Sequence, residues 1–380
     1  MKILIVTNYL PPKIGGIERH TFELACALHK REGTEVTVAH SPWTLNESLN
    51  VEKDTKFDFN TSVIPSITIF GRLPLPKLFS LDYWKYIVSL RSDFDVVLFQ
   101  SHLFMNNWFT SVFLRNIGRR VWLNHSPGFI PMKSRFGKFV VGVYELIGIS
   151  VMKKSCNEFV AQSNNASDWI SGITDIRFRI FPNALNLSYF KNRETEFTRN
   201  FGTSVLYVGR FIEGKGLRES IRLVADANKL LRLKKKSEQF TLTVIGSGPI
   251  DPLEIAKQYD LEIDWLGEMQ YADVISRMFK CDILVQAYPQ PDCLTTVTLE
   301  ALGAGMIVIS TPLSGDKDLE RIKNCVLDQL EALPERLVSL LETSKDRLSY
   351  YRSGQSFIAK NYTWDVVSNQ LISGEYQSRE

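Results

Sequence analysis

The chain has 380 residues, of which 44% are hydrophobic and 23% charged, an ordinary globular composition with more length than one core usually needs. The net charge is only +3 and no basic run could follow a phosphate backbone, which argues against a nucleic-acid-binding protein. The five cysteines show no C-x-x-C or Cys/His metal spacing, and their odd, scattered arrangement indicates a reducing compartment. No signal peptide precedes the first expected strand, so we expect a cytoplasmic protein.

The chain begins with an expected strand at 2–8, which leads through a Pro/Gly loop into an expected amphipathic helix at 17–30. The loop ends with Gly15 and Gly16. A strand, a glycine turn and a helix N-terminus together form a corner that an anion can approach closely. The chain contains no G-x-G-x-x-G fingerprint, which argues against an NAD site.

Strand and helix patterns alternate through both halves, which predicts an α/β protein with two parallel sheets covered by helices. The polar stretch 191–200 has no apolar period and is the expected linker region. The expected strands cover residues 3–7, 35–39, 96–99, 121–124 and 159–162 in the first half, and 205–208, 240–245, 283–286 and 306–310 in the second.

Two histidines directly follow expected strands of the first half. His102 and His125 are therefore expected at the carboxyl end of a parallel sheet, where ligands of such sheets bind. We expect surface or packing positions for His20, His29 and His40, which lie on the first helix or at the end of a strand.

Residues 132–154 combine five cations and one acid, Glu145, with a long apolar stretch. The stretch is too short, and too interrupted by Glu145, to span a membrane. Two interpretations stay open at this point. The segment is either an interfacial helix that contacts anionic lipid, or a core helix with basic ends.

The second half opens with an expected strand that runs into a glycine-rich turn, 209–216, and an expected helix from 217 to about 231. Arg210 and Lys215 flank this turn, and two cations at that spacing can clamp one diphosphate. The turn nearly matches the P-loop pattern, but Gly216 stands where the magnesium-binding hydroxyl belongs. We therefore expect anion binding without the magnesium of an NTPase; the alternative is a basic surface turn.

Further along, Asp292 and Glu300 lie eight residues apart around an expected short helix at 295–304. The free N–H groups at the start of this helix, near Thr295 and Thr296, would face a diphosphate. Glu300, one turn inside, could accept hydrogen bonds from both ribose hydroxyls, and Asp292 could bind hydroxyls of a second ring. The alternative is a solvated Asp and a Glu on the helix surface.

These motifs follow one another in a specific order, from residue 1 to about 364. They are Gly15-Gly16-Ile-Glu18, Leu123-Asn-His125-Ser-Pro-Gly, Val160-Ala-Gln-Ser163, Phe181-Pro-Asn183-Ala-Leu-Asn186, Val208-Gly-Arg210 to Lys215-Gly216, Val244-Ile-Gly-Ser-Gly-Pro249, Trp265-Leu-Gly267 and the two spaced carboxylates. In this order they resemble the family 4 glycosyltransferases, retaining enzymes of the GT-B fold.

The resemblance implies two Rossmann-like domains that face each other across a cleft. The acceptor-side domain would comprise residues 1–186, with 365–380 returning to it, and the nucleotide-sugar-binding domain residues 187–364. The C-terminal stretch 362–371 is expected to cross back onto the first domain.

The resemblance also implies residue roles. Arg210 and Lys215 would bind the donor diphosphate, Glu300 the ribose and Asp292 the transferred sugar, with His125 beside that sugar. The remaining residues implied at the donor site are Gly15, Gly16, Leu266, Thr295 and Thr296.

The sequence departs from the family pattern in several places, and the region beyond Asp318 also looks shortened. Asp292 stands for the usual Glu and is one methylene shorter, so its reach to the donor sugar is in doubt. Leu294-Thr295 replaces the usual Phe-Gly, and Met306 the usual Pro.

The pairs at 93–95 and 316–318 imitate the D-x-D metal motif of other glycosyltransferases, but their positions indicate structural or solvated residues. We therefore expect no metal and no cofactor besides the donor.

The expected activity is transfer of a hexose-type sugar, with retention, from a UDP-sugar or GDP-sugar to a hydroxyl of a saccharide or lipid-linked saccharide. The expected setting is surface polysaccharide or glycolipid assembly, with the protein in the cytoplasm or peripheral on the inner face of the membrane. Two alternatives stay open: a non-enzymatic sugar-nucleotide-binding homologue, and a phosphate-handling NTPase.

Overall fold

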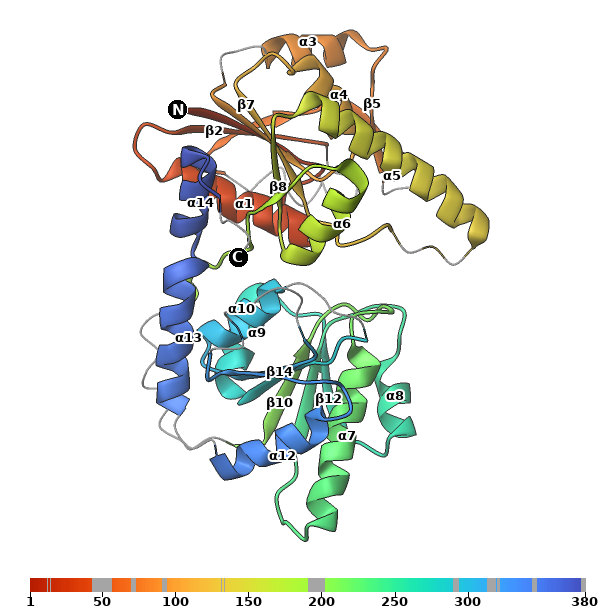
Figure 1. Cartoon of the computed structure of the whole chain (residues 1–380), viewed down its shortest axis with the longest axis vertical. Coiled ribbons are helices and arrows are strands. Elements are labelled where there is room, and N and C mark those ends of the chain that lie inside the picture. The colour runs from red at the N-terminus through yellow and green to blue at the C-terminus, as the bar shows by residue number, and fades with distance from the viewer. Residues whose placement is uncertain are drawn as a thin grey trace. The chain divides into compact units, whose positions relative to one another are not determined.

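The computed structural model forms two compact units, which are shown in Figure 1. The first unit is Met1–Pro182 with Trp364–Glu380, and the second is Asn183–Thr363; the sequence analysis placed these boundaries at 186 and 364. The structure describes residues 1–11, 13, 15–42, 57–69, 73–90, 94–130, 132, 134–190, 202–289, 294–312, 319, 322–343 and 347–376. The expected linker at 191–200 lies outside them.

The first unit contains a parallel sheet of seven strands in the order β3-β2-β1-β6-β7-β8-β9. The strands are β1 (Lys2–Val6), β2 (Glu35–His40), β3 (Asn60–Val63), β6 (Val96–Gln100), β7 (Arg119–Asn124), β8 (Glu158–Ala161) and β9 (Arg179–Ile180). An antiparallel pair, β4 (Ser66–Ile69) with β5 (Leu73–Pro76), stands apart from this sheet. The helices of the unit are α1 (Gly16–His29), α3 (Leu81–Ser89), α4 (Met105–Phe113), α5 (Arg135–Ser155), α6 (Asn164–Thr174) and α14 (Trp364–Ser373).

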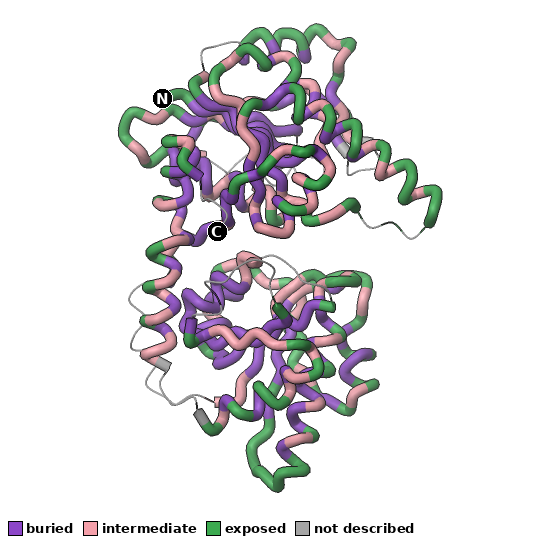
Figure 2. Tube along the Cα trace, in the orientation of Figure 1, coloured by how far each residue is buried: buried purple, intermediate pink, exposed green. Residues whose placement is uncertain are grey.

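The central strands of this sheet are buried along their length, as Figure 2 shows. All five residues of β6 are buried, which is typical of parallel strands covered on both faces. Leu4 and Val6 of β1 belong to a core that includes side chains of α3, α4, α5 and α6. Because side chains alternate along a strand, Ile3 and Ile5 face the opposite side of the sheet.

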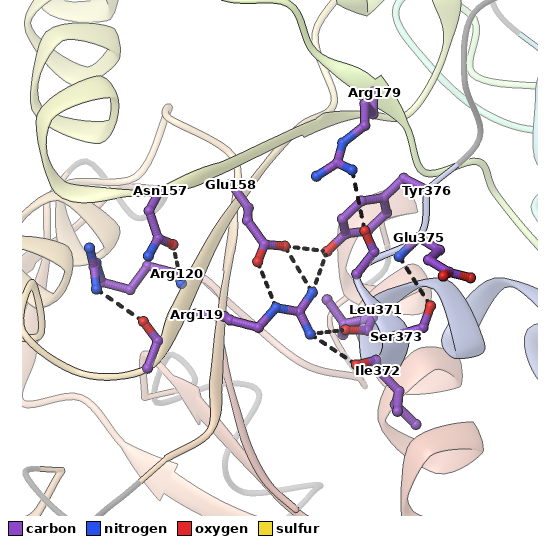
Figure 3. A network of polar contacts seen from close by, with 12 residues as sticks. Arg119, Arg120, Asn157, Glu158, Arg179, Leu371, Ile372, Ser373, Glu375 and Tyr376 are labelled. Atoms are coloured by element: carbon purple, nitrogen blue, oxygen red, sulfur yellow. Dashed lines mark hydrogen bonds and ion pairs between the residues drawn. The ribbon is translucent and has the colours of Figure 1, made fainter.

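The C-terminal segment belongs to the first unit, as the resemblance implied. Helix α14 packs along α1, where Arg31 donates to the Ser368 hydroxyl at 3.2 Å, to the Asp365 carbonyl at 2.6 Å and to the Asn369 side chain. A second anchor is Arg119, shown in Figure 3, which donates to the carbonyls of Leu371 and Ile372 at 3.0 and 2.9 Å. The segment after Thr363 is therefore an integral part of the first unit.

The second unit contains a parallel sheet of six strands in the order β12-β11-β10-β13-β14-β15. The strands are β10 (Ser204–Val208), β11 (Thr241–Ile245), β12 (Ile263–Gly267), β13 (Ile283–Gln286), β14 (Ile307–Ser310) and β15 (Cys325–Leu327). The helices are η1 (Leu187–Tyr189), α7 (Leu217–Leu233), α8 (Pro252–Gln258), α9 (Tyr271–Lys280), α10 (Thr296–Gly303), α12 (Leu333–Thr343) and α13 (Arg347–Asn361).

Helices cover both faces of the second sheet. Val205 and Tyr207 of β10 pack in a core with α7 and α12, whereas Leu206 between them packs in a second core with α9, α10 and α13. The ends of the unit lie together, because Leu185 and Thr363 form a parallel β-bridge and the Leu185 N–H donates to the Tyr362 carbonyl at 2.7 Å.

All nine expected strands are confirmed, with ends that shift by no more than two residues. The apolar pattern of the sequence did not predict β3, β9, β12 and β15, which are the edge strands of the two sheets, or the separate pair β4 and β5. Strand β12 is exposed over much of its length and β15 has only three residues, so neither has the continuous buried apolar run that marks a central parallel strand.

Candidate functional site

A glycine-rich turn follows β10 in the second unit and ends where α7 begins. Gly216 is the residue that precedes α7, and its φ of +74° favours glycine. A Cβ on Gly216 would lie 2.4 Å from the Ala287 carbonyl oxygen, just beyond β13. Arg210 is exposed in this turn and Lys215 is half-buried, with its Nζ 5.9 Å from the centre of the Tyr288 ring. The turn thus carries both expected cations at the carboxyl edge of the sheet.

Backbone from the next strand supports this turn. The Phe211 N–H donates to the Ser247 carbonyl at 2.8 Å, beyond the end of β11. A Cβ on Gly246 would lie 1.9 Å from the Gly209 carbonyl oxygen, and one on Gly248 would lie 2.4 Å from the Phe211 carbonyl oxygen. The glycines at 246 and 248 therefore let two loops pack backbone to backbone.

Residue Leu266 lies on the edge strand β12 and is partly exposed. Its neighbour Trp265 donates from Nε1 to the Gly246 carbonyl at 3.2 Å, and the Gly246 N–H donates to the Gly267 carbonyl at 2.8 Å. The end of β12 therefore lies against the second glycine loop.

The helix α10 begins after Thr295, one residue later than expected. The Thr295 hydroxyl accepts from the Thr298 N–H at 3.2 Å and so caps the helix. Both threonine hydroxyls donate to the Gln286 side-chain oxygen, Thr298 at 2.7 Å and Thr295 at 3.2 Å. Gln286, the last residue of β13, thus fixes the start of α10 against the carboxyl edge of the sheet.

Glu300 lies one turn inside α10 and is only 3% exposed. The alternative of a solvated Glu on the helix surface is therefore wrong. Thr296 is the first residue of the helix. Asp292 lies outside the described residues, as does Cys293 beside it.

In the first unit, His125 follows β7 directly, at the carboxyl end where it was expected. Its Nε2 lies 2.6 Å from the side-chain oxygen of Gln100, so that nitrogen donates and carries the proton. The Gln100 amide nitrogen lies 3.4 Å from Nδ1 of His20, whose ring meets the His125 ring edge-on at 5.3 Å. Gln100 therefore sets the orientation of both imidazoles.

Both imidazoles are held in their neutral form. Burial lowers the pKa of His125 to about 4; a hydrogen bond with Gln162 opposes this shift and the charge of His102 adds to it. Burial also lowers the pKa of His20 well below its ordinary value, and the nearby His125 lowers it further, because two protonated rings would repel each other. At neutral pH this pair can exchange hydrogen bonds but carries no charge.

His102 does not line an open surface, because it is fully buried. Its Nε2 lies 3.4 Å from Oε2 of Glu145 on α5, and its ring is close to those of Trp122 and Trp169. The Glu145 carboxylate also accepts from the Ile130 N–H at 2.7 Å. This buried pair therefore ties the loop after β6, and the loop after β7, to α5.

The two expected loop glycines differ in their surroundings. Gly15 precedes α1 in an extended conformation, and a Cβ there would lie 2.0 Å from the Glu18 carboxylate. The space at Gly15 is therefore occupied by the chain's own Glu18. Gly16 has open space where a side chain would be.

Among the other candidates, Asp95 accepts from the Lys2 N–H at 2.7 Å, which is the structural role expected for it. Asp93, Asp316 and Asp318 lie outside the described residues. Of the remaining histidines, His29 is exposed and His40 buried. Within the described part of the chain, no group of three or more acidic, His or Cys side chains could hold a metal ion.

Sequence reasoning missed Gln100 and Gln286, which occupy equivalent positions in the two sheets. Each is the polar last residue of an otherwise apolar strand, VVLFQ in β6 and ILVQ in β13. Each strand lies beside the first strand of its unit, at the point where the strand order reverses and where such sheets bind ligands. An amide that ends an apolar strand was the signal that could have found them.

Comparison with known proteins gives one consistent result. The profile of Glycosyltransferase Family 4 matches residues 14–189, and that of Glycosyl transferases group 1 matches residues 202–343. An uncharacterised glycosyltransferase of Methanocaldococcus jannaschii is 22% identical, over 96% of this chain and 95% of its own. The phosphatidylinositol N-acetylglucosaminyltransferase gpi3 subunit of Schizosaccharomyces pombe is 20% identical, over 96% of this chain and 78% of its own.

Among solved structures, HepE of Anabaena, in complex with UDP, is similar to this chain with a TM-score of 0.72. The two sequences are 15% identical, and the match covers 98% of this chain and 99% of HepE. At this identity the likeness concerns the fold.

Proposed function

The chain belongs to the family 4 glycosyltransferases and has their GT-B fold, and from this premise we propose that it is a retaining enzyme that uses a nucleoside diphosphate sugar. The observation that carries the proposal lies in the second unit. There the glycine turn with two cations and the start of α10, with Glu300 inside it, meet at the carboxyl edge of one sheet. The acceptor is a hydroxyl group.

Arg210 and Lys215 would bind the donor diphosphate, together with the N–H groups at the start of α10. Charge grows on this diphosphate as the bond to the sugar breaks, and fixed cations and amides stabilise it without reorganising. The leaving phosphate itself would take the acceptor proton on the front face of the sugar. The reaction then requires no nucleophile from the protein.

Glu300 would accept hydrogen bonds from the ribose hydroxyls. The contacts of Gln286 with Thr295 and Thr298 support this role, because they fix the helix that carries Glu300. Asp292 would bind the transferred sugar, and His125 would serve as a neutral imidazole whose tautomer Gln100 selects.

The finer assignments rest on what similar proteins are reported to bind. HepE was solved with UDP and with UDP-glucose, which favours a UDP-sugar over a GDP-sugar as the donor here. The name of the fission-yeast relative indicates a phosphatidylinositol acceptor, which favours a lipid or lipid-linked saccharide here. We further propose surface polysaccharide or glycolipid assembly on the cytoplasmic face of a membrane.

The test separates the two carboxylates by role. Glu300→Gln should weaken binding of UDP and of a UDP-sugar alike, by about 10- to 100-fold, because a hydrogen bond to a charged group is worth about 1.5–3 kcal/mol. Asp292→Asn should leave UDP binding intact and lower turnover, because its contact is made with the sugar. Glu254→Gln, at an exposed position of α8, is the matched control.

Calorimetry with UDP and product analysis with labelled donors give the two readouts, and NMR of the product gives its anomeric configuration. An inverted anomer would contradict retention. Donor binding without any product, across a panel of acceptors, would favour the non-enzymatic homologue. Magnesium-dependent hydrolysis of a nucleoside triphosphate would favour the NTPase.

A further inference from the structure

Helix α5 presents large apolar side chains to solvent along most of its length. Phe136 is 78% exposed and Phe139 is 69% exposed. Figure 2 shows this helix mainly in the colours of exposed and intermediate residues, and in Figure 1 its N-terminal half extends beyond the other helices of the first unit. The other exposed apolar residues of the helix are Val140, Val143, Leu146 and Ile147.

These residues form one continuous stripe. Residues 136, 140, 143 and 147 follow helical spacing, and 139 and 146 flank them on the same side. The opposite side packs against the unit, where a Cβ on Gly148 would lie 2.5 Å from the His102 carbonyl oxygen. The helix is therefore held tightly by its inner side while its outer side is also apolar. None of the described helices is long and apolar enough to cross a membrane.

The charges of α5 show which partner suits this stripe. Its cations stand at both ends of the helix, Arg135 and Lys138 at the start and Lys153 and Lys154 in the last turn, and all four are exposed. Its one acid, Glu145, is fully buried against His102. By helical spacing Arg135 and Lys153 lie on the side of Phe139 and Leu146, Lys154 follows Ile147, and Lys138 lies on the inner side, seven residues before Glu145. The outer surface of α5 therefore offers apolar groups bordered by Arg135, Lys153 and Lys154 and no carboxylate, which is complementary to the acyl chains and headgroups of an anionic lipid surface.

We propose that the outer face of α5 docks the protein on an anionic lipid surface, with the helix lying in the plane of the interface. The loop that enters α5 also exposes Phe129, Ile130 and Met132, but the Ile130 N–H donates to Glu145, so this loop lies on the inner side of the helix and outside the stripe. The same loop begins at His125 and connects the carboxyl edge of the first sheet to α5. Delivery of a lipid-linked acceptor to that edge rests on the proposed function; the docking itself does not.

Flotation of the full chain with phosphatidylcholine vesicles, with and without phosphatidylglycerol, tests the proposal. The protein should bind the anionic vesicles about tenfold or more tightly than the neutral ones, and salt should weaken this binding. The double variant Phe136→Ser with Phe139→Ser should lose about tenfold or more in lipid partition, and Phe136→Trp with Phe139→Trp should retain binding. Arg135→Gln with Lys154→Gln should lose the preference for anionic lipid.

Leu233→Ser is the matched control, because Leu233 is as exposed as Phe136 but lies at the end of α7 in the second unit. Thermal unfolding and UDP binding without vesicles should be unchanged in all α5 variants, which separates lost docking from lost donor binding. Equal binding to both kinds of vesicle, or binding that the α5 variants leave intact, would overturn the proposal. So would concentration-dependent dimerisation that the serine variants abolish, because the stripe would then be an interface between two copies of the chain.

Discussion

Replacing Arg119 should loosen the C-terminal segment from the first unit. Arg119 donates to both carboxylate oxygens of Glu158, from Nε at 2.6 Å and from Nη2 at 2.8 Å. Its Nη1 donates to the carbonyls of Leu371 and Ile372, at the end of α14. As Figure 3 shows, one guanidinium thus joins a strand of the sheet to the returning helix. Nη2 also donates to the Tyr376 hydroxyl at 3.5 Å, so Arg119→Ala removes five hydrogen bonds at once.

The size of the effect follows from the exposure of the pair. A hydrogen bond to a charged group is worth about 1.5–3 kcal/mol when water is excluded, whereas an exposed ion pair contributes about 0.2–1 kcal/mol. The side chain of Arg119 is 28% exposed and that of Glu158 17%, so the site lies between these limits. We expect Arg119→Ala to lower the free energy of unfolding of the first unit by about 2–4 kcal/mol.

Hydrogen exchange resolved by segment is the suitable assay, because a chain of two units need not unfold in one step. Amides of α14 should exchange faster in Arg119→Ala, while those of the second unit stay unchanged. Arg120→Ala is the control. Arg120 is the next residue of β7, and its guanidinium donates to the carbonyls of Ser155, Ile117 and Gly118, which all lie outside α14. Equal exchange of α14 in both variants would refute the anchoring role of Arg119.

The same pair predicts a dependence on pH. Burial alone would raise the pKa of Glu158, but the hydrogen bonds and charge of Arg119, with a hydrogen bond from Tyr376, outweigh it and lower the pKa below its ordinary value. The stabilisation is therefore complete above the unfolded pKa of about 4.3 and is lost as the pH falls through the lower folded value. The difference in the free energy of unfolding between Arg119→Ala and the parent chain should therefore become smaller in that acidic range.

Three further predictions concern the candidate site. Gly216→Ala should lower stability by about 2 kcal/mol or more and abolish UDP binding in a thermal-shift assay, because its Cβ would meet the Ala287 carbonyl at a positive φ. Burial lowers the pKa of His125 to about 4, so its titration should not change kcat/KM between pH about 5 and about 8. An inflection in the pH profile of kcat/KM within this range, lost in His125→Gln, would contradict this. Gln100→Leu should lower kcat and leave UDP affinity unchanged, as titration would show; a loss of UDP affinity would instead indicate general unfolding.

The sequence predicted the central strands because each is a continuous apolar run, and it predicted where Arg210, Lys215 and Glu300 lie because parallel strands end at one edge. It could not predict the contacts of Gln100 or Gln286. These contacts join residues from separate loops and helices, and their geometry depends on strand register that a single pattern does not encode.

Helix α5 illustrates the same limit. Its composition could not separate an interfacial helix from a core helix, because apolar residues occupy both sides of it. The structure distinguishes the sides by burying Glu145 and exposing Phe136, and only then does the charge distribution become informative.

The bridge between Leu185 and Thr363 has a consequence for how this chain can change over evolution. The second unit is inserted in the sequence of the first, and the bridge holds the two ends of the insertion side by side. Residues 183–363 can therefore be removed or exchanged as one piece, because their two ends already lie together. The first unit keeps its own closing helix, α14, which follows the insertion in the sequence. Under the proposed function, a chain built in this way could acquire a different donor preference by exchange of the second unit, while α5 and the imidazole pair stay in place.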